Sequence, residues 1–323
     1  MGLPAVAVTV LLAVLAAGSN ALASVLQRKG ARSEPDDASM SLRMLWSLAR
    51  KPSWVGGVTA ILVGFALQVA ALATGPLALV QPILVAELGF TLILSSLVLR
   101  AKLRLREWTA VSGMSAGLAL LLVALSPSSG DSRDVPGEVW ALGSAVTLAV
   151  IGALLALGYR NHYAHRAAYF GLASGTYFGF LAALIAGVTP AFAVGLGAVF
   201  TTWQTYAVMV AGPVGFFLLQ NTLRAGSLVA SQPGLTLANP LVGITWGVAV
   251  FGEHVRGGGW IAAQLFGAAL LAACTMLLVR SPLLRGSEGA QEEADEAADD
   301  AAEAAAEAEP DGTERADRSQ PSH

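Results

Sequence analysis

Ionisable residues and cysteine are scarce in this chain. Of its 323 residues only 13% are charged while 55% are hydrophobic, and the mean hydropathy is +0.63. A soluble domain carries roughly twice that charged fraction, so the composition argues against a soluble protein and indicates one embedded in a membrane. The single cysteine, Cys274, excludes a disulfide within the chain and lies in an apolar run, where we expect a small core side chain.

Lysine is also scarce, since it supplies only 3 of the 19 basic residues, a bias typical of a GC-rich bacterial genome. Residues 1–286 hold 17 Lys and Arg against 9 Asp and Glu, a net charge of +8, whereas residues 287–323 hold 2 against 13, a net charge of −11. The total of −3 is therefore a cancellation between two unlike parts and indicates nothing about partners. We predict no nucleic-acid partner. The acidic end lacks aromatic and large aliphatic residues, so we expect residues 281–323 to form a disordered cytoplasmic tail.

Long apolar runs make up most of the remaining chain. A hydrocarbon core about 30 Å thick needs about 20 apolar residues of helix. Nine segments meet this requirement: 3–26, 55–74, 77–99, 108–125, 137–158, 168–188, 204–223, 226–250 and 260–279. We therefore predict an all-α integral membrane protein with about nine transmembrane helices.

The basic residues between the spans predict the orientation. With the N-terminus outside, the inner segments hold 15 Lys and Arg, and the outer loops hold only Arg133 and Arg256. Cytoplasmic loops retain Lys and Arg, so we expect the N-terminus outside, the C-terminus inside, and a multi-pass protein of the bacterial plasma (inner) membrane.

A shift of 151 residues aligns two parts of the chain. "GPLALVQP" at 75–82 falls on "GSLVASQP" at 226–233, which share the pattern G-x-L-x-x-x-Q-P. The matching spans lie five apart, so repeat partners run in opposite directions, as in the inverted repeats of secondary transporters. This predicts a first half at 1–126 and a second half at 127–280. The first half lacks one span of a 10-helix fold, and residues 39–54, too polar to cross, predict an amphipathic surface helix in its place.

These residues resemble the drug/metabolite transporter (DMT) superfamily, its EamA-like members, and most of all the NIPA-type branch. "LQRKGA" at 26–31 is similar to the K-K-G that follows the family's first span, and "KPSWVGG" at 51–57 to its tryptophan-glycine entry to the next. "GPLALVQPIL" followed by "RAKLRLREW" is similar to its P-x-x-L-V-x-P-L and short basic connector. The resemblance covers residues 1–126 and implies transport of small metabolites, drugs or magnesium. Phe65 and Gln68 stand where the family has an acidic residue and Asn.

Glu87 is the only carboxylate in the interior of a predicted span. It is the eleventh residue of 77–99, a segment about 34 Å long as a helix, and therefore lies near the bilayer midplane. A charge there costs roughly 2.5 kcal/mol or more and usually marks function. We predict that Glu87 binds the coupling proton or cation, and that Thr91 and Ser95 share its helix face.

Polar residues beside prolines complete the predicted substrate and coupling-ion site. Pro82 removes the hydrogen bond to the Ala78 carbonyl, and the freed acceptor needs a partner or lines water. Gln81 and Gln232 are predicted to approach each other across the repeat axis, beside Pro82 and Pro233.

Asn239, before Pro240, predicts a second helix break and is a further candidate. Weaker candidates for the site are Asn20, Gln68, Thr91, Ser95, Gln220 and Asn221. For the amides among them, a role as interhelical hydrogen-bonding groups is at least as well supported as solute contact. Glycines at helical spacing predict close helix packing: Gly171, Gly175 and Gly179, with the pairs Gly113/Gly117 and Gly243/Gly247.

The sequence thus favours a secondary transporter that moves a small solute by alternating access. Two alternatives stay open: a NIPA-like magnesium or divalent-cation transporter, and a membrane-embedded lipid-handling protein or enzyme. The spans carry no cluster of His, Asp or Ser that would predict catalysis. We predict no cofactor apart from the coupling proton or cation, a small-molecule or ion substrate and the lipid bilayer as partners, and no defined metal site; the oligomeric state is open, with a homodimer as one alternative.

Overall fold

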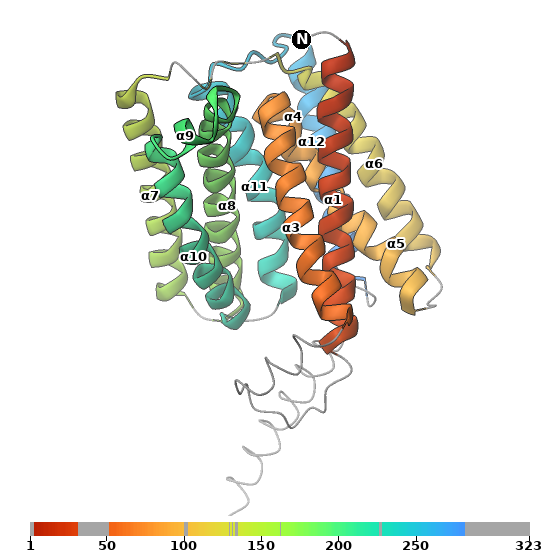
Figure 1. Ribbon diagram of the computed structural model, residues 1–323. Helices are drawn as coiled ribbons and strands as arrows, with labels where there is room; N and C mark the ends of the chain where they lie inside the picture. The colour runs from red at the N-terminus through yellow and green to blue at the C-terminus, as the bar shows by residue number, and fades with distance from the viewer. Residues whose placement is uncertain are drawn as a thin grey trace, which may run out of the picture. The chain divides into compact units, whose positions relative to one another are not determined.

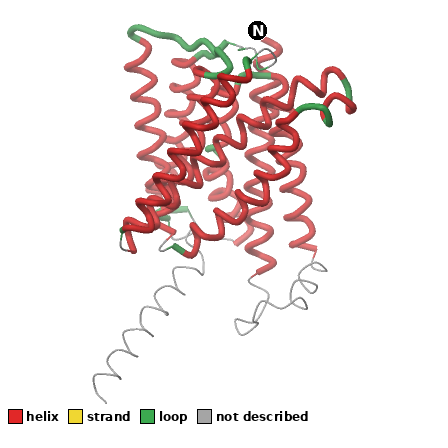
Figure 2. Tube along the Cα trace, turned by 90° about the vertical axis from the view of Figure 1, so that its left-hand side faces the viewer, coloured by secondary structure: helices red, strands yellow, loops and turns green. Residues whose placement is uncertain are grey.

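The computed structural model describes residues 3–31, 52–99, 103–128, 130, 132, 135–161, 163–225 and 228–281. Over these ranges the chain is helical apart from short connections and one isolated β-bridge, between Ser128 and His254. The helices are α1 (Leu3–Ala31), α3 (Pro52–Thr74), α4 (Leu77–Leu84), α5 (Glu87–Leu99), α6 (Leu105–Leu125), α7 (Gly137–Arg160), α8 (Tyr163–Val194), α9 (Leu196–Val199), α10 (Trp203–Arg224), α11 (Leu228–Ala249) and α12 (Trp260–Val279). Figures 1 and 2 show them as one bundle of steeply aligned helices.

The chain divides into two units, Met1–Leu284, which holds this bundle, and Arg285–His323. The predicted tail from residue 282 onward lies outside the described residues. Most of the predicted surface helix, residues 39–51, also lies outside them, whereas residues 52–54 open α3. Pro52 suits the first position of that helix, because the missing N–H has no intrahelical partner there.

Seven of the described helical segments are long and apolar enough to cross a membrane. They match seven of the nine predicted spans: Pro4–Leu26, Val55–Thr74, Leu77–Val98, Leu105–Leu125, Gly137–Arg160, His165–Val194 and Trp260–Val279. The other two predicted spans coincide with α10 and α11, each 22 residues long but less apolar because of their amides and prolines. The all-helical class is confirmed, while the count of nine spans and their orientation stay predictions.

The outward faces of the bundle are apolar. Large hydrophobic side chains stand more than half exposed on most of the long helices, among them Leu11, Leu62, Leu97, Leu142, Phe217 and Leu265. Water would penalise such a surface, whereas a bilayer matches it, and a helix satisfies its backbone polar groups internally. These exposed side chains therefore agree with a multi-pass membrane protein.

The three predicted glycines of α8 pack against α11. A Cβ atom added to any of them would overlap a backbone carbonyl oxygen of α11, and the opposing residues follow the same four-residue spacing: Ser231, Leu235 and Asn239. Small residues at this spacing let helix backbones approach closely in a membrane. The prediction of close helix packing is confirmed here.

Helices α6 and α12 cross through a reciprocal glycine contact. A Cβ atom on Gly117 would lie 3.1 Å from the Gly267 carbonyl oxygen, and one on Gly267 would lie 3.1 Å from the Gly117 carbonyl oxygen. Gly113 lies against the sulfur of Cys274, one turn away. The packing role predicted for Gly113 and Gly117 is therefore confirmed, and the lone cysteine is a buried packing side chain.

The predicted span 77–99 is not one helix. It ends as α4 at Leu84 and resumes as α5 at Glu87, with a turn at Val85 and Ala86 between them. By contrast, α11 runs unbroken through Pro233 and Pro240, so the break predicted at Asn239-Pro240 is wrong. Neighbouring helices can re-satisfy the groups that a proline frees, which lets a membrane helix continue past it.

Candidate functional site at the α4–α5 break

Helix α4 lies in the interior of the bundle. Of the seven candidate spans, Leu77–Val98 has 61% of its apolar 18-residue window buried, and only His165–Val194, with 67%, has more; the other five reach 33% at most. Contacts surround α4 on several sides, from α1, α3, α6, α8 and α11. A two-turn helix with neighbours all round is a position where a solute would meet several spans at once.

The N-terminus of α4 is capped from the other half of the chain. The Glu253 carboxylate accepts hydrogen bonds from the backbone N–H of Leu77, at 2.6 Å, and of Ala78, at 2.9 Å. The first N–H groups of a helix have no intrahelical partner and form its positive end, so a carboxylate stabilises them by hydrogen bonding and by charge. Glu253 is itself 5% exposed.

The loop between α11 and α12 is built to turn Glu253 inward. Gly252 has a φ of 66°, a left-handed conformation that glycine adopts without strain. The ring of Phe251 packs against Trp140 and Trp246, with centroid distances of 5.5 and 6.3 Å, and anchors the loop. Burial raises the pKa of the Glu253 carboxyl above its usual 4.5, and the hydrogen bonds from the α4 amides partly offset this.

Sequence reasoning missed the role of Glu253, because its partners lie about 175 residues away in the chain. A lone carboxylate after a glycine, in a short loop between two apolar helices, was the feature that could have identified it.

The break between α4 and α5 places Glu87 at a helix N-terminus. The turn is held by short-range bonds in which the N–H of Val85 and Ala86 donate to the carbonyls of Pro82 and Ile83. Glu87 is the first residue of α5, so its carboxylate lies at the positive end of that helix. Pro82 is fully buried inside α4, three residues before the turn.

Glu87 pairs with Asn20 of the first helix. The side-chain amide of Asn20 donates a hydrogen bond to the half-buried Glu87 carboxylate. Asn20 lies over Gly64 of α3, where its amide occupies the space that a larger residue at position 64 would fill. Glu87 and Asn20, predicted separately, are therefore brought together, and Gly64 makes room for the pair.

The remaining candidates around Glu87 fall on neighbouring helix faces. Thr91 and Ser95, one and two turns after Glu87 on α5, are buried at 5% and 2% exposure. Gln68 is half-buried and follows Gly64 by one turn on α3. The polar face predicted for α5 is thus turned into the bundle.

Gln81 lies against α11 rather than against Glu87. Its side chain packs on Gly243, where a Cβ atom would lie 2.5 Å from the Gln81 Cγ. Gln81 is 1% exposed, and among the described residues neither its amide oxygen nor its amide nitrogen has a hydrogen-bond partner. One turn from Gly243, the Oδ1 of Asn239 is also buried without a described partner.

The predicted approach of Gln81 to Gln232 is wrong. Gln232 lies eleven residues before Gly243 on α11, about 16 Å along the helix at 1.5 Å per residue. An inverted repeat places equivalent residues at equal distances on opposite sides of the midplane, so residues one turn inside each helix cannot meet. Half-buried Gln232 and Pro233 are accordingly near the far end of α11.

Gln220 and Asn221 lie in the last turn of α10, which packs on α8. The side-chain amide of Asn221 donates to the Phe217 carbonyl one turn back, at 2.7 Å. This local bond is a structural role, and the structure does not bring the two amides to Glu87.

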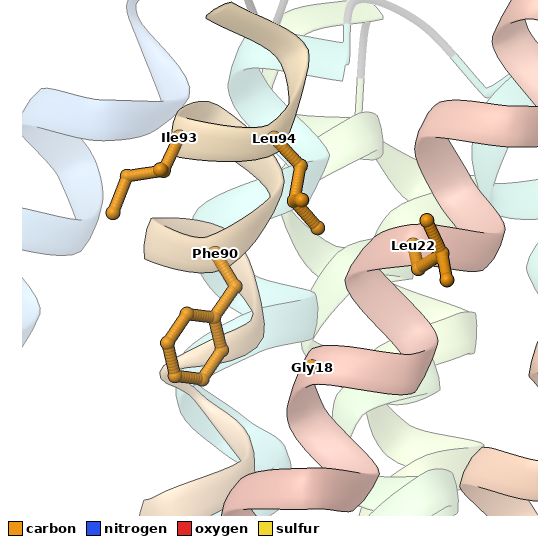
Figure 3. A pocket seen from close by; sticks show the side chains of 5 residues that line it. All are labelled: Gly18, Leu22, Phe90, Ile93 and Leu94. Atoms are coloured by element: carbon orange, nitrogen blue, oxygen red, sulfur yellow. The ribbon is translucent and has the colours of Figure 1, made fainter. Parts of the chain in front are cut away.

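A cavity of about 340 Å³ lies between α1 and α5 (Figure 3). Its lining is Gly18 and Leu22 from α1 and Phe90, Ile93 and Leu94 from α5. Leu22 is 40% exposed, so the cavity opens at the bundle surface. An apolar groove of this kind suits a lipid chain better than a polar solute. Elsewhere, the described His, Cys, Asp and Glu residues form no group of three or more that could hold a metal ion.

The chain is similar to an uncharacterized protein of Corynebacterium glutamicum. The two are 29% identical over 255 residues, which is 77% of this chain and 88% of the relative. No protein-family model matches the chain. No solved structure matches it either.

Proposed function

We propose that the protein is a secondary transporter of the drug/metabolite type that moves a small solute across the bacterial plasma membrane by alternating access. The observation that carries the proposal is the interrupted span at Val85 and Ala86, with Glu87 at the first position of α5 and paired to Asn20. Discontinuous helices with ionisable groups at their ends form the substrate and ion sites of many secondary transporters.

The location of the interruption supports a transport role. A break in a membrane helix is tolerated where the backbone is buried in protein or lines water, because unpaired peptide groups cost several kcal/mol in lipid. Here it occurs in one of the two most buried spans. Glu87 sits at this break, whereas Glu107 and Glu138 lie in the first turns of the unbroken helices α6 and α7.

The packing of α6 on α12 supports the inverted repeat that alternating access would use. A two-fold axis that relates α6 to α12 and α4–α5 to α11 makes any contact between two related helices reciprocal. The Gly117 and Gly267 contacts are reciprocal, and Gln81 of α4 packs on Gly243 of α11. The reciprocal α6–α12 contact agrees with such an axis.

In the proposed cycle, Glu87 binds the coupling proton or cation. In this structure the carboxylate is held by Asn20, which ties α5 to the α1–α3 pair. Binding of the proton or cation to Glu87 would change the strength of its hydrogen bond with the Asn20 amide. This change would bias the position of α5 relative to α1 and α3. A ligand can shift two conformations only by binding them unequally, and the Glu87–Asn20 contact supplies such a difference.

Purified protein in liposomes that enclose a pH-sensitive dye tests the function. A panel of amino acids, sugars, nucleosides and quaternary ammonium cations is added outside. We expect at least one solute to drive proton movement in liposomes with protein and not in empty ones. Labelled solutes that enter both kinds of liposome equally across the whole panel, with no proton movement, would contradict the proposal.

A further inference from the structure

The Gln81 amide has an unusual environment for a side chain in the middle of a membrane bundle. It is 1% exposed, packed on Gly243, and neither of its polar atoms has a described partner. Buried polar groups are nearly always hydrogen-bonded, because an unmet donor or acceptor is penalised by its full desolvation. A glutamine held in this state points to a partner beyond the described residues.

A second unmet group belongs to the same seam between α4 and α11. The Oδ1 of Asn239 is buried without a described partner, and Asn239 precedes Gly243 by one helical turn. Residues four apart lie on one side of a helix, so Asn239 and the Gly243 recess that receives Gln81 occupy neighbouring positions on α11. Two independent helices therefore contribute unsatisfied amide atoms.

The seam carries one carboxylate, that of Glu253, which lies against Gly247 of α11 and already accepts hydrogen bonds from the N–H groups of Leu77 and Ala78 of α4. Neither α4 nor α11 contains an Asp, Glu, Lys, Arg or His residue. Glu87 lies six residues after Gln81, beyond the break, and already accepts a hydrogen bond from Asn20. An anion bound between α4 and α11 would meet the Glu253 carboxylate and no counter-ion, and a cation would have to compete for Glu253 with the two N–H groups of α4. Burying an unpaired charge is far more unfavourable than burying a hydrogen-bonded neutral group.

We propose that the α4–α11 seam is the solute site and that it binds an uncharged solute through hydrogen bonds to the Gln81 amide and the Asn239 oxygen. This inference rests on the proposed function, since it names the substrate class of that transporter. A carboxamide presents a donor and an acceptor side by side. It therefore matches a solute edge with the complementary pair, such as a carboxamide, a lactam or a pyrimidine edge. Water would hydrate the amides between transport events.

The first test compares two glutamines whose amides differ in pairing. Gln264 donates from its amide nitrogen to the carbonyls of Ala124, at 3.1 Å, and Arg256, at 2.6 Å. Thermal unfolding of the detergent-solubilised protein is followed with a thiol-reactive dye that reports exposure of buried Cys274. We expect Q264L to lower the unfolding temperature, because two bonds are lost, and Q81L to leave it unchanged or raise it. If Q81L lowers the unfolding temperature as much as Q264L does, the proposal is overturned, because Gln81 would then be a paired structural residue.

The second test uses matched neutral and charged probes. Nicotinamide and uracil are compared with their carboxylate counterparts, nicotinate and orotate, at millimolar concentration. A ligand that binds only the folded state raises the unfolding temperature. We expect one or both neutral probes to stabilise the parent protein and not Q81L, and the carboxylates to have no effect. Stabilisation by the carboxylates alone, or by none of the four, would overturn the assignment of the solute class.

Failure of this inference is distinguishable from failure of the proposed function. Unfolding temperatures report on Gln81 without any transport step, whereas the liposome assay reports transport whichever residues bind the solute. If a solute drives flux but Q81L is destabilised, the proposed transport function is kept and the α4–α11 seam is rejected as the solute site.

Discussion

Replacing Glu253 by alanine should destabilise the bundle more than its loop position suggests. The side chain accepts hydrogen bonds from the N–H groups of Leu77 and Ala78 and joins the α11–α12 loop to α4. In E253A both N–H groups would lose their acceptor while staying buried. Since α4 carries Gln81 and leads into the break before Glu87, the same change should loosen the proposed site.

The size of the effect follows from those two bonds. A buried donor left unsatisfied costs about 1–3 kcal/mol, and loss of a helix N-cap costs about 0.5–2 kcal/mol. With two donors of α4 affected, we expect E253A to lower the free energy of unfolding by about 3 kcal/mol. In E253Q the amide oxygen still accepts one bond, but its NH₂ group faces a donor, so we expect roughly half the effect.

The assay is thermal unfolding in detergent, followed through the reaction of Cys274 with a thiol-reactive dye. E138A is the matched control, because Glu138 is exposed in the first turn of α7. We expect E253A to have the lowest unfolding temperature and E253Q an intermediate one, with E138A and the parent unfolding at the highest temperature. If E253A unfolds at the temperature of E138A, Glu253 does not cap α4 and the reasoning is refuted.

The pH dependence of the same measurement isolates the carboxyl group. Burial raises the pKa of Glu253 above 4.5, so the folded protein binds that proton more tightly than the unfolded chain does. Its contribution to stability is therefore fully present below pH 4.5 and is lost as pH rises through the raised pKa. E253Q should therefore show a smaller change of unfolding temperature with pH than the parent does. An equal pH dependence in E253Q and the parent would show that another group causes it.

The helix packing and the topology give two further predictions. G171A should lower the unfolding temperature, because its Cβ would overlap the Ser231 carbonyl oxygen of α11. In the control G152A the added Cβ meets nothing within 4 Å, so the unfolding temperature should stay the same or rise slightly. Equal unfolding temperatures of the two variants would contradict the close packing of α8 on α11. With Cys274 replaced, a cysteine at Ser129 should react from outside the cell and one at Ser287 only after permeabilisation, and labelling of both from one side would contradict an odd number of spans.

Sequence reasoning located the helices because length and apolarity alone determine what can cross a bilayer. It also identified the glycine faces of α6 and α8, since small residues at four-residue spacing have few other uses in a membrane helix. Glu87 was identified because a carboxylate inside an apolar run is expensive and therefore informative. Each of these features is local, and each can be recognised within about twenty residues.

The features that escaped the sequence depend on contacts between distant segments. Nothing in a local pattern states that Glu253 reaches α4, or that Gln81 packs on Gly243 rather than meeting Gln232. A proline in the sequence also did not by itself predict a helix break. The chain breaks shortly after Pro82, yet α11 passes through Pro240 without a break, because the surrounding helices decide whether a freed carbonyl finds a partner.

The most direct test of the central claim compares uphill transport by E87Q and by the control E138Q in liposomes, for a solute that the parent moves. Glutamine keeps the shape and hydrogen bonding of Glu87 but cannot exchange a proton or pair with a cation. We expect E138Q to accumulate solute like the parent, and E87Q to fold and exchange solute without accumulating it between pH 6 and 8. Uphill transport by E87Q equal to that of the parent over this range would show that Glu87 only packs the helices and that coupling lies elsewhere.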